Sequence, residues 1–403
     1  MRIGIDYTAA ARQRAGIGRY TRELIAALLA LVGQDGILPH QYVLFAAVGG
    51  LPRAHWQREI DRLRAARHSQ LTIRTLPLSD DWLARLWHRL RLPVPVETIT
   101  GPLDIFYSPD FVLPPTRRGT RALLTVHDLS FLHYPEHFVP KLVQYLTQVV
   151  TRSVARADWV LADSDATRAD LIAHLGTEPE KVQVLYSGVD ACFCPQPEPG
   201  EAERIRARYS IGDPSTGSGR CRPYILSVGT LQPRKNYIRL IQAFAHLHAD
   251  LQLLIAGGKG WLYEDILAEA EKHPDSVRVL GFVDDRDLPA LYRNASLFAF
   301  PSLYEGFGLP VLEAMACGVP VVCSDVSSLP EVAGDAALLV NPLDTSDLTA
   351  AMALVLGDAD LRRKMIAKGF AQAARFSWGK AARQLADTFD ALGQPQGFTV
   401  PSQ

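Results

Sequence analysis

Two glutamates frame a glycine-rich turn in the second half of the chain. Residues 305–313 read E-G-F-G-L-P-V-L-E, which places Glu305 and Glu313 on either side of seven residues. The turn follows an apolar run, 297–301, with the length of a buried strand. Glycines within the turn relieve the backbone of side-chain clashes, and Pro310 suits the first position of a helix. We therefore expect Glu305 on the loop and Glu313 on the first helical turn.

This placement favours a ligand that carries both sugar hydroxyls and phosphate. The carboxylates accept hydrogen bonds from hydroxyls, and the unpaired N–H groups of a new helix bind phosphate. A nucleotide sugar has both groups. Two carboxylates could instead supply the acid and the base of a glycosidase. That interpretation is the weaker one, because a loop residue and a helix residue would contact different parts of a ligand.

The composition bounds the class of protein. A chain of 403 residues suits two domains of about 150 to 200 residues. With 42 basic against 43 acidic residues, it is not expected to bind nucleic acid. Residues 2–6 resemble a strand rather than a signal peptide, and no run of about 18 apolar residues occurs, so a cytoplasmic protein is expected. The five cysteines lack metal-binding spacing and are expected to be reduced.

Short β-branched runs alternate with helical stretches along the chain, the pattern of an α/β protein with parallel sheets. The first group of expected strands comprises 2–7, 42–48, 71–76, 104–107, 122–126, 159–162 and 182–185. The second comprises 224–228, 251–256, 277–280, 297–300, 319–323 and 337–340. We predict two Rossmann-like, doubly wound domains that face each other across a cleft, with ligands at the carboxyl ends of the strands.

A stretch rich in proline, glycine and serine separates the two groups of strands. A last helical stretch follows the second group and is expected to pack back on the first domain. The predicted parts are an N-terminal domain (1–195), a linker (196–222), a C-terminal domain (223–376), a C-terminal helix (377–393) and a tail (394–403).

Two loops of the first domain carry further candidates. Gly16 and Gly18 open a helix and would let the backbone approach a phosphate or a sugar. The third glycine of the dinucleotide fingerprint is lacking, so a structural turn is the alternative. His127, followed by Asp128, ends the strand 122–126 and is placed to donate a hydrogen bond to a substrate hydroxyl or phosphate. The alternative is a histidine whose hydrogen bonds are satisfied within the fold.

A basic pair follows the first strand of the second domain. Arg234 and Lys235 lie at a strand exit and before a helix, where two cations can neutralise a diphosphate. A solvated basic pair is the alternative, and the helix dipole disfavours it because cations are unfavourable at a helix N-terminus.

One segment of the first domain has the character of a surface that contacts membranes. Residues 82–92 read W-L-A-R-L-W-H-R-L-R-L, a basic amphipathic segment with two tryptophans. It could touch an anionic membrane surface or dock its apolar face on the first domain.

Together these motifs resemble those of the retaining GT-B glycosyltransferases of family 4, over nearly the whole chain. They occur in family order: residues 16–18, His127-Asp128, Arg234–Asn236, Gly281–Val283, the E-x7-E of Glu305 and Glu313, and Cys317–Pro320. Within the family the chain is most similar to bacterial O-antigen and exopolysaccharide mannosyltransferases, through Val126–Phe131, Val228–Asn236 and Ser302–Pro310.

The resemblance implies a role for each candidate. Glu305 would hold the hydroxyls of the donor sugar, Lys235 the diphosphate, and His127 would contact the sugar near the reacting centre. Further donor contacts would come from Gly16, Gly18, Arg234, Val283 (base), Gly306, Phe307, Gly308, Leu309 and Glu313 (ribose). Many relatives carry arginine where this chain has Thr230, so the phosphate clamp rests on the basic pair or is completed differently.

The implied activity is transfer of a hexose, foremost mannose from GDP-mannose, to a glycan or lipid-linked glycan. The N-terminal domain would bind the acceptor and the C-terminal domain the nucleotide sugar, with the anomeric configuration retained and without a metal or other cofactor. Peripheral contact with the inner face of the plasma membrane is expected. The alternatives are UDP-glucose or another donor, an epimerase or phosphorylase, and a non-catalytic partner subunit that binds a nucleotide sugar.

Overall fold

The computed structural model describes residues 1–13, 16–35, 40–65, 70–211, 222–247 and 250–394. The chain divides into two compact units. Unit 1 comprises Met1–Leu129, Gln144–Gly188 and Ser377–Gln403. Unit 2 comprises Ser130–Val143 and Val189–Phe376. This division differs from the predicted parts, because unit 2 begins before the expected linker and also takes in Ser130–Val143.

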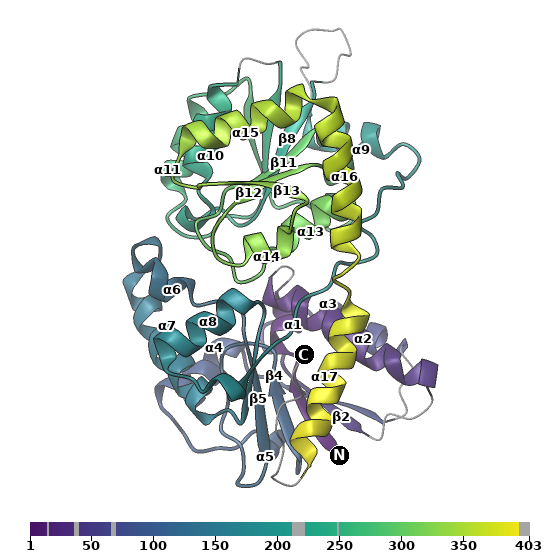
Figure 1. The fold of residues 1–403 in the computed structure, drawn as a ribbon. Coiled ribbons are helices and arrows are strands. Elements are labelled where there is room, and N and C mark those ends of the chain that lie inside the picture. Colours follow the sequence, from purple (N-terminus) through teal and green to yellow (C-terminus); the bar gives the residue numbers. More distant parts are fainter. Residues whose placement is uncertain (14–15, 36–39, 66–69, 212–221, 248–249, 395–403) are drawn as a thin grey trace. The chain divides into compact units, whose positions relative to one another are not determined.

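Within the described residues, the sheet of unit 1 has seven parallel strands in the order β3-β2-β1-β4-β5-β6-β7 (Figure 1). The chain starts in the middle of the sheet, extends to one edge and then returns to build the other half, as in doubly wound folds. The strands are β1 (Arg2–Asp6), β2 (Gln41–Ala47), β3 (Leu71–Leu76), β4 (Ile105–Ser108), β5 (Arg121–Val126), β6 (Trp159–Ala162) and β7 (Val182–Val184).

Helices of the first part of the chain connect these strands. Several have clear local signals: Ser164 caps α8 by accepting from the Thr167 N–H, and Gly176 ends that helix in the left-handed region. The helical elements are α1 (Thr8–Arg12), α2 (Ile17–Asp35), α3 (Arg53–Ala65), α4 (Asp80–Leu83), the π-helical turn η1 (Ala84–Arg89), α5 (Glu97–Thr100), α6 (Ser130–His133), η2 (Pro135–His137), α7 (Pro140–Arg156), α8 (Asp165–Leu175) and η3 (Pro179–Lys181).

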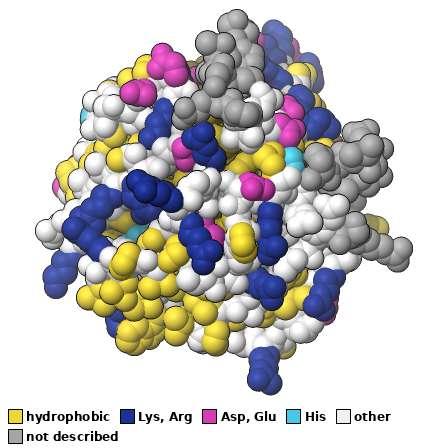
Figure 2. Space-filling model, turned by 90° about the horizontal axis from the view of Figure 1, so that it is seen from below, with side chains coloured by type: hydrophobic (Ala, Val, Ile, Leu, Met, Phe, Trp, Pro, Cys, Tyr) yellow, Lys and Arg dark blue, Asp and Glu magenta, His cyan; other side chains and the backbone are white. Residues whose placement is uncertain are grey.

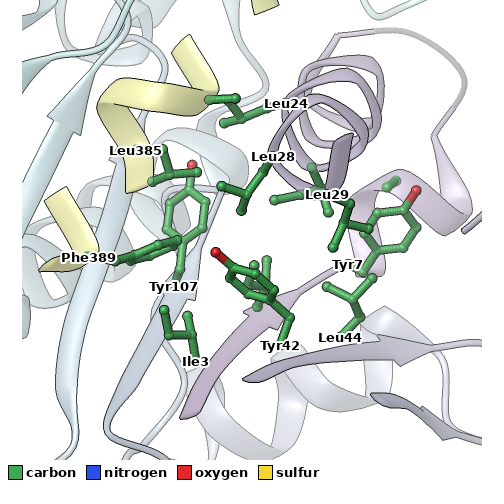
Figure 3. Close-up of a cluster of buried hydrophobic side chains, with 14 of the residues drawn as sticks. Ile3, Tyr7, Leu24, Leu28, Leu29, Tyr42, Leu44, Tyr107, Leu385 and Phe389 are labelled. Atoms are coloured by element: carbon green, nitrogen blue, oxygen red, sulfur yellow. The ribbon is translucent and has the colours of Figure 1, made fainter. Parts of the chain in front are cut away.

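The last helix, α17 (Trp378–Gly393), belongs to unit 1 although it follows all of unit 2 in sequence. Its apolar face, with Leu385 and Phe389, lies against α2 and the sheet (Figure 3). Leu28 of α2 and Tyr107 of β4 are part of the same buried cluster. The C-terminal helix therefore completes the core of the unit that contains the N-terminus.

Within the described residues, the sheet of unit 2 has six parallel strands in the order β10-β9-β8-β11-β12-β13. Burial is complete along β9, so both faces of the sheet are covered and the strand is apolar throughout after its first residue. The strands are β8 (Tyr224–Val228), β9 (Gln252–Ala256), β10 (Val277–Gly281), β11 (Leu297–Phe300), β12 (Val321–Ser324) and β13 (Ala337–Val340).

The helices of unit 2 lie on both faces of its sheet (Figure 1). On one face α10, α11 and α15 form a core with alternate strand residues such as Leu253 and Ile255. The helical elements are α9 (Glu201–Tyr209), η4 (Pro233–Lys235), α10 (Tyr237–Ala245), α11 (Glu264–Glu271), α12 (Leu288–Arg293), α13 (Leu309–Ala316), α14 (Leu329–Ala333), α15 (Thr345–Gly357) and α16 (Ala359–Ala373).

Part of the predicted linker is folded into unit 2. Helix α9 lies within it, and Glu201 at its start forms a buried ion pair of 2.6 Å with Arg293 of α12. Arg208 near its end pairs with the buried Asp287 at 2.7 Å. Residues 212–221, which include the predicted breaker-rich stretch, lie outside the described residues.

The two parallel sheets confirm the predicted α/β class and its Rossmann-like, doubly wound topology. The expected strands match the observed ones within a few residues at each end. Among the described residues, the structure contains no helix of the length and apolar character needed to cross a membrane.

Candidate functional site

The basic pair and Glu305 meet at the carboxyl edge of the unit 2 sheet. Arg234 and Lys235 follow β8 in the turn η4, and Glu305 follows β11. Because β8 and β11 are neighbours in the sheet, their following loops lie side by side. Lys235 Nζ lies 2.6 Å from Glu305 Oε1, and Arg234 Nη1 lies 3.1 Å from Oε2.

This ion-pair cluster is largely shielded from water. The side chains of Arg234 and Lys235 are each 11% exposed, and that of Glu305 is 9% exposed. Burial alone would raise the pKa of Glu305, but the charges of Lys235 and Arg234 outweigh burial and lower that pKa. The carboxylate is therefore held ionised, with one cation on each oxygen.

Backbone contacts between the two loops fix the cluster. The Leu303 N–H donates to the Arg234 carbonyl at 2.9 Å, and the Arg234 guanidinium donates to the Tyr304 carbonyl. Asn236 donates from Nδ2 to the Pro301 carbonyl at 3.0 Å. The loops therefore present the three charged side chains from a rigid base.

Two serines that the sequence analysis did not identify hold the Glu305 loop from the other side. Ser327 accepts from the Glu305 N–H at 2.9 Å. The buried Ser328 donates to the carbonyls of Glu305 and Phe307. Both serines follow β12, the neighbour of β11. Their position in the loop after the predicted strand 319–323 is the signal that could have indicated them.

The glycine-rich turn leads into α13 through Gly308. Its φ of 112° lies in the region that favours glycine, and a Cβ there would approach Leu329 Cδ2 to 2.7 Å. Helix α13 begins at Leu309, which makes Pro310 its second residue and not its first. Glu313 is the fifth residue of the helix, so its predicted place on the first turn was wrong. The helix starts at Leu309 because the backbone of Gly308 has a positive φ, which lies outside the helical region.

Glu313 is buried in unit 2, with 2% of its surface exposed. Its Oε2 accepts from the Tyr292 hydroxyl of α12 at 2.9 Å. Val283, the predicted base contact, follows β10 and is also buried, whereas Phe282 beside it is 52% exposed. The structure does not test the contacts of Glu313 and Val283 with a nucleotide, and these remain predictions.

In unit 1, His127 lies at the carboxyl edge of the sheet as the sequence predicts, and both ring nitrogens have partners. Nδ1 lies 2.6 Å from Asp163 Oδ2, and Nε2 lies 3.0 Å from the Pro109 carbonyl. Burial alone would lower the pKa of His127. The charge and hydrogen bond of Asp163, with the charge of Asp110, raise that pKa to about 9.

Further carboxyl groups end the central strands of unit 1. Asp6 ends β1, and burial raises its pKa to about 6. Burial also raises the pKa of Asp110, which follows β4, while the charge of His127 opposes that shift. These groups and Asp163 were not among the candidates predicted from the sequence. Their position at the carboxyl ends of predicted strands is the signal that could have indicated them.

The glycine loop of unit 1 precedes α2, as predicted. Gly16 has a φ of 58°, and a Cβ there would meet nothing within 4 Å. Gly18 lies in the first turn of α2, where a Cβ would approach the Gln13 and Ala9 carbonyl oxygens to 2.2 and 2.7 Å. Close packing of backbone therefore accounts for Gly18 without a ligand, and contact of either glycine with a donor stays a prediction.

The chain matches two protein-family models and is similar to a known mannosyltransferase. A model described as "Glycosyl transferases group 1" matches residues 214–372, and one described as "Glycosyltransferase Family 4" matches residues 14–192. The chain is 33% identical to the O-antigen chain mannosyltransferase B of Escherichia coli, covering 94% of this chain and 96% of that protein.

A second relative and a solved structure extend the comparison. The chain is 34% identical to the serotype-specific mannosyltransferase WbdA of Escherichia coli, over 67% of this chain but only 32% of that longer protein. The fold is similar to sucrose-phosphate synthase from Thermosynechococcus elongatus, with a TM-score of 0.71, 20% identity and coverage of 97% and 99% of the two chains.

Proposed function

Because the chain belongs to the group 1 glycosyltransferases of family 4, we propose that it transfers a mannosyl residue from GDP-mannose to a glycan acceptor. The proposal includes retention of the anomeric configuration and independence of metal ions. The observation that carries it is the shielded cluster of Arg234, Lys235 and Glu305. The choice of mannose is supported by the two relatives named as mannosyltransferases.

The ion-pair cluster suits a donor with two anionic phosphates. In the protein alone, Glu305 pairs with both cations and offsets one of their two positive charges. A diphosphate can replace it as their partner, because guanidinium and ammonium groups bind phosphate and carboxylate alike. Glu305 then becomes available to accept hydrogen bonds from sugar hydroxyls. Binding of the diphosphate and of the sugar are thus coupled through one carboxylate.

Transfer with retention is proposed to occur by attack on the face that the diphosphate leaves. The bond from the anomeric carbon to the phosphate oxygen breaks, the bond to the acceptor oxygen forms, and the leaving phosphate takes the acceptor proton. No protein nucleophile is required. Catalysis then depends on position and on charge stabilisation of the leaving group, which Lys235 and Arg234 supply.

The remaining candidates are assigned to the nucleotide and to the reacting centre. The backbone from Gly306 to Leu309 would contact the sugar and the diphosphate, and Glu313 would bind the ribose. Backbone near Val283 would contact the base. His127 would act as a cation near the sugar, because both of its nitrogens have acceptors as partners.

The same cluster supports the proposed independence of metals. Its two cations are available to neutralise a diphosphate in place of a divalent ion. Activity should therefore be unchanged in excess EDTA, and a strict requirement for magnesium or manganese would count against the proposal.

The acceptor is proposed to be a lipid-linked glycan, held where unit 1 contacts a membrane. The two tryptophans of segment 82–92 have different environments. Trp87 is 9% exposed and packs against Phe45 with ring centroids 6.1 Å apart. Trp82 and Leu90 are 52% and 65% exposed, and the Arg85 guanidinium lies 5.1 Å from the Trp82 ring. Figure 2 shows a face on which hydrophobic side chains gather beside Lys and Arg side chains.

Flotation with vesicles rich in phosphatidylglycerol tests the membrane contact. The native protein should bind, and Trp82→Ser with Leu90→Ser should lose binding, because Trp and Leu at an interface supply the apolar contact. Leu354→Ser is the matched control, since Leu354 is 53% exposed on α15. Absence of binding by the native protein would remove this part of the proposal.

A panel of nucleotide sugars tests the donor and separates the alternatives. A thermal-shift screen should single out GDP-mannose, since a ligand at 100 times its dissociation constant adds about 2.7 kcal/mol of stability. A larger shift with UDP-glucose would change the donor. Binding without transfer to any acceptor would favour a partner subunit, and release of nucleotide without an acceptor would favour an epimerase. Dependence on inorganic phosphate would favour a phosphorylase.

A further inference from the structure

The pairing of two strands places a carboxylate next to His127. Strands β5 and β6 are parallel neighbours, with Val126 opposite Ala162 at their carboxyl ends. His127 directly follows β5, and Asp163 directly follows β6. The register of the sheet therefore brings the two side chains together, and the Nδ1–Oδ2 distance of 2.6 Å shows direct contact.

The partners of the ring define its protonation. Asp163 Oδ2 and the Pro109 carbonyl oxygen lie 2.6 and 3.0 Å from the two nitrogens. An ionised carboxylate and a carbonyl only accept hydrogen bonds, so both contacts are satisfied together only when both nitrogens carry a proton. With Asp163 ionised, the geometry thus selects the imidazolium form; burial raises the pKa of Asp163, and the charge and hydrogen bond of His127 oppose that shift.

The backbone and the surroundings of Asp163 hold it in place. Asp163 precedes Ser164, whose side chain caps α8, so the carboxylate lies between a strand end and a helix start. Among the described residues, Asp163 Oδ1 is buried and has no hydrogen-bond partner. The hydrogen bond with His127 is therefore the interaction that offsets the free-energy cost of burying this carboxylate.

Groups from other elements surround the same ring. The ring of Tyr20, from α2, lies edge-on with centroids 4.8 Å apart, and Phe111 lies 6.0 Å away. The charged and titratable groups around His127 are Asp163 from the loop after β6, Asp110 from the loop after β4, the Tyr20 phenol, and Asp128 next in the chain. Asp163 is the carboxylate among them that hydrogen-bonds to the ring.

We propose that Asp163 is a positioning residue for His127: its carboxylate holds Nδ1–H, keeps the ring doubly protonated and turns Nε2–H toward the Pro109 carbonyl. His127 then serves transfer as a fixed cation and cannot act as a general base, because neither nitrogen has a free lone pair. A substrate oxygen can take the place of the Pro109 carbonyl or share Nε2–H with it. The role of His127 in transfer rests on the proposed function, whereas its protonation by Asp163 does not.

The protonation of His127 can be measured without any substrate. In full-length protein with ¹⁵N-labelled histidine, the ring signals that disappear in His127→Gln should show two protonated nitrogens at pH 7 and titrate near pH 9. Asp163→Asn should lower this midpoint by about one to three pH units. Asp165→Asn is the control, because Asp165 is an exposed aspartate two residues after Asp163. This change should leave the midpoint of the His127 titration unchanged.

Rate measurements test the consequence for transfer. With donor and acceptor, the native kcat should not change between pH 6 and 8. In Asp163→Asn, kcat should fall about tenfold for each pH unit above the lowered midpoint and recover at pH 6, with less change in KM. A role confined to folding would instead lower the rate by the same factor at every pH.

Either of two results overturns the proposal: a native midpoint near that of free histidine, or a pH-independent loss in Asp163→Asn. The native titration requires no variant, so it decides the matter even if Asp163→Asn does not fold. It also requires no donor. If GDP-mannose proved to be the wrong donor, the titration would still distinguish that failure from a failure of this inference.

Discussion

The change Lys235→Met is expected to abolish most transfer while leaving the protein folded. It removes one of the two cations that face Glu305 and keeps a side chain of similar length. Lys235 Nζ lies 2.6 Å from Glu305 Oε1 and 4.9 Å from the centre of the Phe300 ring. Because the lysine side chain is only 11% exposed, water cannot readily replace the lost charge.

The magnitude follows from the two roles of the ammonium group. Loss of one charge-assisted contact of about 2 to 4 kcal/mol with the leaving diphosphate slows turnover about 30- to 1000-fold. Removing one partner from a buried ion pair costs about 3 to 5 kcal/mol of folding free energy. Arg234 remains 3.1 Å from Glu305, so the loss of stability should fall below that range.

The assay is the initial rate of transfer from saturating GDP-mannose at 25 °C, with a thermal melt of each variant. Lys259→Met is the matched control, because Lys259 is an exposed lysine of unit 2 whose ammonium group lies 5.0 Å from the Tyr263 ring. A folded Lys235→Met protein with a rate within threefold of native would refute the assigned role. An equal loss in Lys259→Met would refute its specificity.

Three further predictions concern stability. Gly308→Ala should lower the free energy of unfolding, measured by denaturant titration, by about 1 to 3 kcal/mol, because the φ of Gly308 is 112°. Gly258→Ala is the control and should change this free energy little, because a Cβ added there would meet no atom within 4 Å. Phe389→Ala should cost unit 1 about 3 to 5 kcal/mol in the same titration, because the ring is fully buried; a loss below 1 kcal/mol would contradict the packing of α17. The pKa of His127 is raised to about 9 from about 6.5 in an unfolded chain, so its contribution to stability is complete below pH 6.5 and is lost as the pH rises through 9. The native protein should lose about 3 kcal/mol over that range relative to His127→Gln, and parallel stability curves would show that the histidine is not charged.

The strands of both sheets could be predicted because each one has a local pattern. Strand β11, for example, is an apolar run of four residues between polar segments, and the structure gives the bounds that the sequence indicates. The site loops could be predicted for a related reason, because ligands of doubly wound sheets bind after the strands.

The segment with two tryptophans shows where local pattern fails. Its sequence allowed both membrane contact and docking on the first domain, and the structure divides the tryptophans between an exposed and a buried position. The π-helical turn η1 contains Trp87, whose ring packs against Phe45, whereas Trp82 precedes this turn in α4 and stays exposed. Sequence periodicity assumes regular helices and cannot reveal such a turn.

By itself, the sequence determined the fold class, the loops that carry Arg234, Lys235, Glu305 and His127, and the family. Tertiary structure decided the partners of these residues. Glu305 is 70 residues from Lys235, and Asp163 is 36 residues from His127. Such pairs meet because parallel strands distant in sequence become neighbours in a sheet, and the order of strands is not encoded in any local pattern. The sequence thus identified side chains able to do the chemistry, whereas the sheet order brought Glu305 to the basic pair and Asp163 to His127.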